Sequence, residues 1–160
     1  MPSDIEVVGQ TVERKPIVFD PKLSRDNPSK RYRSLLKEYK AMHDAGYGIF
    51  NGRSLVKYVS FIKNFLEGND CKTLLDYGCG KGHLYMQEHF ESVTDAIKEP
   101  LPYFWNLDSY HLYDPGYEDF KTLPTEKYDA VICTDVMEHI PEEDLGWVIR
   151  EIFSYAKKMV

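Results

Sequence analysis

The segment TLLDYGCGKGHLY, residues 73–85, constrains the fold of this chain more than any other stretch. A short apolar run ends in Asp76, and three of the five residues after Tyr77 are glycine. Such a run, bounded by turn residues, is typical of a buried strand, and glycine lets the main chain turn sharply and approach a ligand closely. We therefore predict a strand over residues 73–77, an open loop, and a helix from about Lys81 to Phe90, which together begin a βαβ unit.

Two further strands follow along the chain. The first covers residues 110–113 and is followed by the turn sequence Asp-Pro-Gly. The second is YDAVICT, residues 128–134, an apolar run flanked by acids. Pro141 and the three acids after it predict the start of a helix. The predicted buried face of this helix consists of Leu145, Val148, Ile149, Ile152, Phe153 and Ala156. Because strands and helices alternate, we predict an α/β fold with a Rossmann-like, mostly parallel sheet and flanking helices.

Two amphipathic helices are predicted before the first strand. Apolar residues at helical spacing from Tyr32 to Met42 indicate the first, and Ser54 and Gly68 are expected to bound the second. The loop GYGIFNG joins them and presents aromatic and apolar side chains on a glycine-rich backbone. The predicted domains are an N-terminal arm at 1–28, a helical cap at 29–68 and an α/β domain at 69–160.

Charge and cysteine content bear on partners and compartment. The net charge is −6, yet residues 21–40 hold seven Lys or Arg and two acids, which is typical of a solvated helix face; the alternative is a contact for an acidic acceptor or a phosphate backbone. An acidic chain disfavours duplex nucleic acid as a partner without excluding nucleic acid. Three widely spaced cysteines argue against disulfides or a metal site, and no stretch resembles a membrane span or signal peptide. We expect a cytoplasmic protein without a membrane partner.

Three acids are predicted at the carboxyl ends of strands, where open α/β sheets bind ligands. They are Asp76, Asp114 and Asp135. The glycine spacing differs from a dinucleotide loop, which would place glycine at His83, and the Lys-Ser/Thr pair of a phosphate loop is absent. The pattern favours a ligand with a ribose and an amino-acid tail but no pyrophosphate. Asp114 would accept hydrogen bonds from the ribose, and the alternative is a turn cap.

Together, LLDYGCGKG, YDP and YDAVICTDVMEHIP resemble class I S-adenosylmethionine-dependent methyltransferases, over roughly residues 72–158. The resemblance implies S-adenosylmethionine as cofactor, with its methionine part in the glycine loop, its ribose on Asp114, and the transfer site bordered by residues 135–139. The cofactor-binding residues that it implies are Asp76, Tyr77, Gly78, Cys79, Gly80, Gly82, Asp114, Pro115, Asp135 and Val136.

The sequence departs from the family pattern in two places. Residues 115–127 are too few for the helix and strand that usually carry an acid beside the adenine, and GYEDF, residues 116–120, is a candidate local substitute. Only three strands are identified, and the chain stops at KKMV, about where the next should begin. We expect a compact or C-terminally incomplete member of the family, whose open sheet edge favours homo-oligomerisation.

The expected function is methyl transfer to a small-molecule or glycan-like acceptor. A non-catalytic, partner-dependent module of the same fold is the alternative, and a nucleotide-dependent oxidoreductase is disfavoured by the loop spacing. His139 is the candidate general base, because it follows the third strand where an acceptor would enter; the alternative is a structural role. The aromatic loop at 46–52 and the cluster Tyr103–Trp105, within a predicted insertion at 92–108, either close over the site or simply pack.

Overall fold

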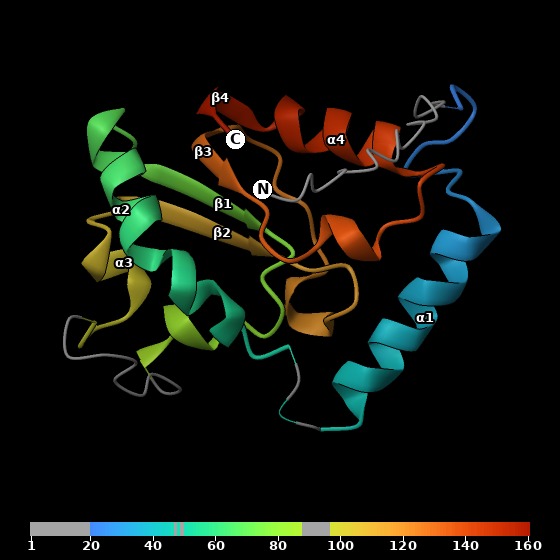
Figure 1. The fold of residues 1–160 in the computed structure, drawn as a ribbon, viewed down its shortest axis with the longest axis horizontal. Coiled ribbons are helices and arrows are strands. Elements are labelled where there is room, and N and C mark those ends of the chain that lie inside the picture. The colour runs from blue at the N-terminus through green and yellow to red at the C-terminus, as the bar shows by residue number, and fades with distance from the viewer. Residues whose placement is uncertain (1–19, 47, 49, 88–96) are drawn as a thin grey trace, which may run out of the picture.

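The computed structural model describes residues 20–46, 48, 50–87 and 97–160. Within these residues, four parallel strands form one sheet in the order β2-β1-β3-β4 (Figure 1). The strands are β1 (Thr73–Tyr77), β2 (Ser109–Tyr113), β3 (Tyr128–Ile132) and β4 (Ala156–Met159). Asp76 of β1 pairs with Leu112 of β2 and Ile132 of β3, so the carboxyl ends of these three strands meet at one edge of the sheet.

Helices cover both faces of the sheet (Figure 1). The 3-10 helix Arg53–Tyr58, α2 (Val59–Gly68) and α3 (Leu101–Phe104) lie on one side, and α4 (Leu145–Ser154) lies on the other. The first helix, α1 (Lys30–Asp44), instead runs past the carboxyl ends of the strands. The position of α1 leaves room for a site between this helix and the strand ends.

The central strand β1 is buried on both faces and therefore joins two cores. Leu74 packs in the core under α2 with Leu66, whereas Leu75 packs in the opposite core with Trp147 and Val148 of α4. Both leucines of β1 are fully inaccessible to solvent. Successive side chains of a strand point to opposite faces, so this short run stabilises both layers at once.

The α/β fold class and the parallel sheet are confirmed. Strand β1 has the predicted bounds, β2 begins one residue earlier than predicted, and β3 lies within the predicted segment. Helix α1 begins after its N-cap Ser29, whose hydroxyl accepts a hydrogen bond from the Tyr32 amide, and it ends just before Gly46. The division into arm, cap and α/β domain stays a prediction.

The helix expected from Lys81 is wrong over the residues that the structure describes. A single 3-10 turn, His83–Tyr85, takes its place. Gly82 has a positive φ of 59°, and Met86 is extended, so neither residue continues a helix. Tyr85 is held in the core, where its hydroxyl donates a hydrogen bond to Asp76 at 2.7 Å. Residues 88–90 of the expected helix lie outside the described part of the chain.

The C-terminal segment is a fourth strand, which the sequence reading missed. The Tyr128 amide donates to the Tyr155 carbonyl, and β4 then pairs with β3. The expectation of three strands ending before KKMV was wrong, because Lys157 and Lys158 hide the strand pattern. Exposed lysines are common on edge strands, where they discourage pairing with other chains. Homo-oligomerisation through this edge stays a prediction.

The start of α4 and its buried face differ from those predicted. Pro141 lies in a turn closed by the Asp144 amide, and the helix begins only at Leu145. Ile149 and Phe153 are exposed, and Ala156 lies beyond the helix in β4. The buried side of α4 is formed by Trp147, Val148 and Ile152.

The predicted insertion at 92–108 contains α3 and a buried anchor. Trp105 is buried, and its indole Nε1–H donates a hydrogen bond to the Val59 carbonyl at 3.0 Å. Tyr103 is 70% exposed. Trp105 therefore packs against α2, which is the second of the two alternatives expected for the cluster, and none of the three residues is in the lining of the pocket described below. Residues 92–96 lie outside the described part of the chain.

Candidate functional site

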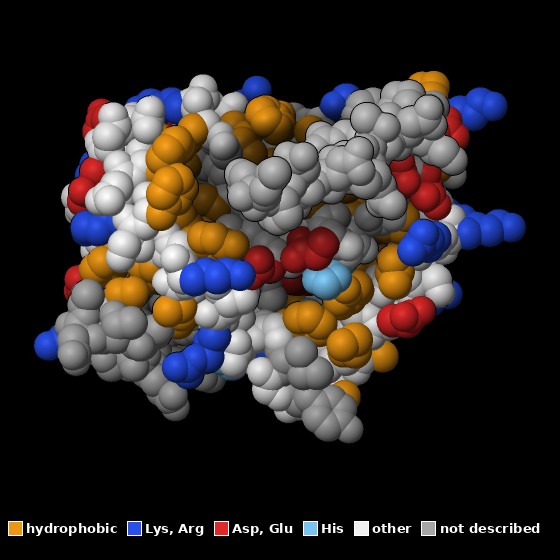
Figure 2. Space-filling view, in the orientation of Figure 1, with side chains coloured by type: hydrophobic (Ala, Val, Ile, Leu, Met, Phe, Trp, Pro, Cys, Tyr) orange, Lys and Arg blue, Asp and Glu red, His pale blue; other side chains and the backbone are white. Residues whose placement is uncertain are grey.

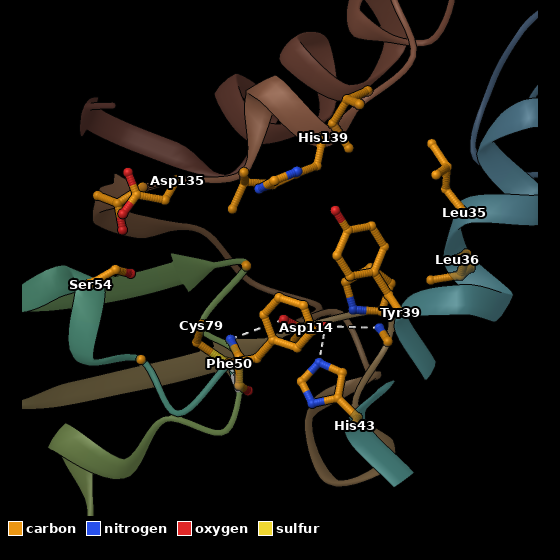
Figure 3. Close-up of a pocket in the computed structure, with 18 of the residues that line it drawn as sticks. Leu35, Leu36, Tyr39, His43, Phe50, Ser54, Cys79, Asp114, Asp135 and His139 are labelled. Carbon is orange, nitrogen blue, oxygen red and sulfur yellow. Dashed lines mark hydrogen bonds and ion pairs between the residues drawn. The ribbon is translucent and has the colours of Figure 1, made fainter. Parts of the chain in front are cut away.

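A pocket of about 150 Å³ opens at the carboxyl ends of β1, β2 and β3, facing α1 (Figure 3). The sheet side is formed by the loop after β1, the turn after β2 and the segment after β3. The opposite side is formed by α1, and Phe50 and Ser54 complete the lining. The structure thus brings together segments that lie far apart in the sequence.

At two positions of the glycine loop, a side chain would clash with a neighbouring segment. Gly78 has a φ of 94°, and a Cβ there would lie 2.2 Å from a methyl carbon of Val136. Gly80 has a φ of 59°, and a Cβ there would lie 2.2 Å from the Phe50 carbonyl oxygen. The Lys81 amide donates to that same carbonyl at 2.6 Å. The loop is therefore packed between the segment after β3 and the aromatic loop before α2.

Asp114 joins the glycine loop to the turn after β2. Its Oδ2 accepts a hydrogen bond from the Gly80 amide at 2.9 Å, and its Oδ1 accepts one from the Gly116 amide at 2.8 Å. The turn-cap interaction that the sequence left as an alternative is therefore present. A carboxylate offers about four acceptor positions, so both oxygens keep capacity for a ligand hydroxyl.

His43 approaches Asp114 from α1. Its Nε2 lies 3.8 Å from Oδ1 of Asp114, and the ring packs between Phe50 and Tyr117 with centroid distances of 5.0 and 5.2 Å (Figure 3). The residue is 6% exposed. Burial lowers the pKa of His43, and the nearby Asp114 carboxylate opposes this shift. A neutral imidazole is therefore favoured beside the acid.

The segment after β3 supplies the remaining polar side chains (Figure 3). Asp135 has a positive φ of 53° and its carboxylate lies 3.3 Å from Lys57 Nζ. His139 is exposed, and its ring meets the Tyr39 ring edge-on at a centroid distance of 5.6 Å. Acidic side chains and a histidine gather near the centre of this face of the molecule (Figure 2).

Asp76 and Gly82 lie behind the pocket rather than in its lining. Both border a neighbouring cavity of about 20 Å³. Asp76 is buried, its Oδ1 has no hydrogen-bond partner among the described residues, and burial raises its pKa to about 7. Tyr77 points to the opposite face of the sheet, where its hydroxyl donates to Glu151 at 2.7 Å and accepts from Arg25.

The other sequence-predicted site residues come together in the pocket lining. These residues are Gly78, Cys79, Gly80, Asp114, Pro115, Asp135, Val136 and His139. Of the segment GYEDF, only Gly116 reaches the lining, because Glu118 forms ion pairs with Lys40 and Lys121 on the surface. Neither acid of this segment therefore lines the pocket.

The sequence predicted a helical cap that includes α1 but did not identify which residues of α1 line the site. Its apolar residues were expected at helical spacing, but the structure turns Leu35, Leu36 and Tyr39 toward the pocket (Figure 3). The periodic pattern was the available signal, although it is equally typical of a core-facing helix. Phe50 lines the site, which is one of the two alternatives expected for its loop. Tyr47 and Ile49 lie outside the described residues.

The described residues contain no group of three His, Cys, Asp or Glu side chains that could hold a metal ion. The three cysteines are free, and burial raises the pKa of the Cys79 thiol. No helix within the described ranges has the length and apolar character that a membrane crossing needs.

Comparison with known proteins decides the family. Residues 50–159 match the family model described as a methyltransferase domain. The chain belongs to this family. The resemblance to class I S-adenosylmethionine-dependent methyltransferases is thereby confirmed, and class I members use S-adenosylmethionine as methyl donor. The family assignment does not support the oxidoreductase alternative.

One curated relative of this methyltransferase-family chain is a ubiquinone biosynthesis O-methyltransferase of Hydrogenovibrio crunogenus. The two are 34% identical over 95 residues, which cover 52% of this chain and 38% of the relative. The matched region thus spans well under half of the relative's length. No solved structure matches the chain at a significant level.

The pocket fits the cofactor that class I members use. Gly78 and Gly80 both line the pocket and carry no side chain, so a ligand there would meet main-chain atoms at these positions. Asp114 keeps acceptor capacity for a diol, and two carboxylates in the lining favour a positively charged group over a negative one.

Proposed function

We propose that this chain binds S-adenosylmethionine in the pocket and transfers its methyl group to a small-molecule acceptor. The observation that carries the proposal is the hydrogen bond from the Gly80 amide to Asp114. This hydrogen bond brings the main chain of the glycine loop next to the carboxylate at the end of β2. The main chain would contact the amino-acid tail of the cofactor, and the carboxylate would bind its ribose. An oxygen acceptor is favoured, because the curated relative is named as an O-methyltransferase.

Each wall residue has a proposed role in holding the cofactor. The main chain at Gly78, Cys79 and Gly80 would contact the methionine part, and Asp114 would accept hydrogen bonds from the ribose. Pro115 and Val136, from the turns after β2 and β3, would give apolar contacts to the adenosine. Asp76 would support the loop from behind, through its contact with Tyr85.

The chain's own task in the reaction is alignment and exclusion of water. When bound, the cofactor would supply an electrophilic methyl group on a positively charged sulfur, with a neutral thioether as the leaving group for attack by the acceptor oxygen. His139 would accept the hydroxyl proton, because its ring faces the pocket beside Tyr39. The competing role is structural, since the His139 amide closes a turn with the Val136 carbonyl.

Calorimetry with S-adenosylmethionine, S-adenosylhomocysteine and NAD tests the proposal. We expect both sulfur ligands to bind, and Asp114→Ala to weaken them at least tenfold. Asp108→Ala, at the amino end of the same strand and outside the pocket lining, is the matched control and should bind normally. Binding of NAD without either sulfur ligand would overturn the proposal.

Transfer of a labelled methyl group separates catalysis from binding. We expect label in a small acceptor, and binding without transfer to any acceptor would identify a non-catalytic cofactor-binding module instead. For His139→Gln we expect turnover to fall about 100-fold or more, with unchanged S-adenosylhomocysteine affinity. Glu138→Gln, also exposed, is the control, and full turnover of His139→Gln at every pH would remove the proton-accepting role.

A further inference from the structure

We propose that the acceptor is an uncharged, apolar molecule with a flat ring, held between α1 and the segment after β3. This inference rests on the proposed function, since it assigns the part of the same pocket that the cofactor leaves open. It goes further by choosing between a charged, a sugar-like and an apolar acceptor. Three properties of the described residues carry the choice: the chemistry of the α1 wall, the charges in the lining, and the arrangement of rings.

The α1 wall is mainly apolar. Leu35, Leu36 and Tyr39 turn toward the pocket (Figure 3), Ile140 of the segment after β3 also lines it, and the imidazole of His43 lies beside Asp114. A sugar acceptor would need several hydrogen-bonding partners for its hydroxyls, because polar groups that lose water without a partner are costly to bury. This wall offers aliphatic carbon and tyrosine rings instead, so it favours an apolar body.

The charges in the lining disfavour an anionic acceptor. Among the described residues that line the pocket, none is Lys or Arg, whereas Asp114 and Asp135 both contribute carboxylates. Lys57, beside the mouth, is already paired with Asp135 at 3.3 Å. A carboxylate or phosphate on the acceptor would therefore meet like charge, with no Lys or Arg of the described lining to compensate it.

The basic residues of α1 do not change this balance, because they lie on its outer side. Lys30, Arg31, Arg33 and Lys37 are all exposed, and Lys and Arg side chains project outward at this end of the molecule (Figure 2). The sequence alone left open whether the basic helix contacts an acidic acceptor. The inner face of α1 carries leucine and tyrosine, so we expect these residues to contact the acceptor.

The rings at the site favour a planar ligand. Tyr39 is tilted on Phe50 at a centroid distance of 5.4 Å and stands edge-on to His139 at 5.6 Å. Aromatic rings attract one another in offset and edge-to-face arrangements, so a ligand ring can add to this row. A hydroxyl on that ring would then lie near His139, the proposed proton acceptor.

Fluorescence titration of the chain saturated with S-adenosylhomocysteine tests the inference with two probes. The probes are 1-naphthol and 1-hydroxy-2-naphthoate, which share a fused ring system with the hydroxyl at the same position and differ in a carboxylate. We expect 1-naphthol to bind at least tenfold more tightly. Equal or tighter binding of the carboxylate probe would overturn the inference.

Two neighbouring variants locate the probe. Leu36→Lys places a cation in the wall, and we expect it to weaken 1-naphthol at least tenfold and to reduce or reverse the preference between the probes. Lys37→Met, on the exposed side of the same helix turn, should leave both probes unchanged. Unchanged naphthol affinity in Leu36→Lys would overturn the inference. Leu35→Asn gives a second, milder test, with weaker naphthol binding expected.

Cofactor binding by every variant separates the two proposals. In the unaltered chain, normal S-adenosylhomocysteine binding together with failure to bind 1-naphthol would overturn the acceptor inference alone. Absence of S-adenosylhomocysteine binding in the unaltered chain would overturn the proposed function, and the acceptor inference with it.

Discussion

The Gly80 amide and the Asp114 carboxylate are joined by a hydrogen bond of 2.9 Å, which ties the loop after β1 to the end of β2. The second oxygen of the same carboxylate holds the Gly116 amide. A single side chain therefore sets the relative position of two segments of the pocket wall. The shape of the site depends on its charge and on both of its oxygens.

Asp114→Asn should disturb this arrangement while keeping the size of the side chain. The amide group would face one of the two main-chain donors with its own donor, so one hydrogen bond is lost. We expect a loss of about 1–2 kcal/mol in the free energy of unfolding, from urea titration. S-adenosylhomocysteine affinity should fall at least tenfold by calorimetry. Asp108→Asn is the matched control, and unchanged ligand affinity in Asp114→Asn would contradict the prediction.

Gly80→Ala should destabilise the chain and impair ligand binding. Its positive φ disfavours any side chain, and the new Cβ would clash with the Phe50 carbonyl. We expect a cost of about 2 kcal/mol in urea unfolding, because strain and displacement of the neighbouring loop add together. Gly68→Ala, at the end of α2 with no atom within 4 Å of the new Cβ, should be neutral or up to ~1 kcal/mol more stable. Equal effects of the two substitutions would contradict this account.

Several parts of the structure could be predicted because their patterns are local. A short apolar run before glycines specified β1, and apolar residues at helical spacing specified α1. The strand-end positions of Asp114 and Asp135 also followed from the parallel sheet, since strand ends converge by topology rather than by sequence distance.

Other parts could not be predicted, because they depend on tertiary packing. Strand β4 carries two lysines and shows its strand character only in pairing with β3. The inner face of α1 has the pattern of a core helix, and only its position beside the strand ends turns it into a pocket wall. The turn after Gly82 replaces a helix because Tyr85 reaches Asp76 in the core.

Asp76 should make stability fall as pH rises. Burial raises its pKa to about 7, above the ordinary value near 4, so the folded chain retains a proton that the unfolded chain releases between these pH values. The contribution of this group is fully present below about pH 4 and is lost by about pH 7, at a cost of up to ~4 kcal/mol. We expect Asp76→Asn to flatten this slope in urea unfolding measured from pH 4 to 8.

Asp129 provides a control, because its pKa is shifted in the opposite direction to that of Asp76. Hydrogen bonds from the Lys72 and Thr73 amides lower its pKa, so its contribution is present at neutral pH and is lost as the pH falls. Asp129→Asn should therefore alter only the acidic side of the profile. A slope between pH 4 and 7 that Asp76→Asn leaves unchanged would assign it to another group.

Arg25 should stabilise the fold from outside the sheet. Its guanidinium pairs with Glu151 of α4 and donates to the hydroxyls of Tyr77 and Tyr113 at 3.0 and 2.8 Å. Arg25→Met leaves the partly buried Glu151 without its cation, and we expect a loss of roughly 2 kcal/mol, less than for a fully buried pair. Chemical unfolding measures it, with the exposed Lys22→Met as control. A double variant with Glu151→Gln should lose less than the sum of the two single losses.

The two walls of the pocket are formed by segments with different structural roles. Strand ends and their turns carry one wall, and they also hold the sheet together, whereas α1 carries the other and lies beyond the sheet. Substitutions at Leu35 and Tyr39, which lie outside both core clusters, can therefore accumulate without disturbing the strands. In evolution or in the laboratory, selectivity could be rewritten within a single helix while the donor side of the pocket stays the same.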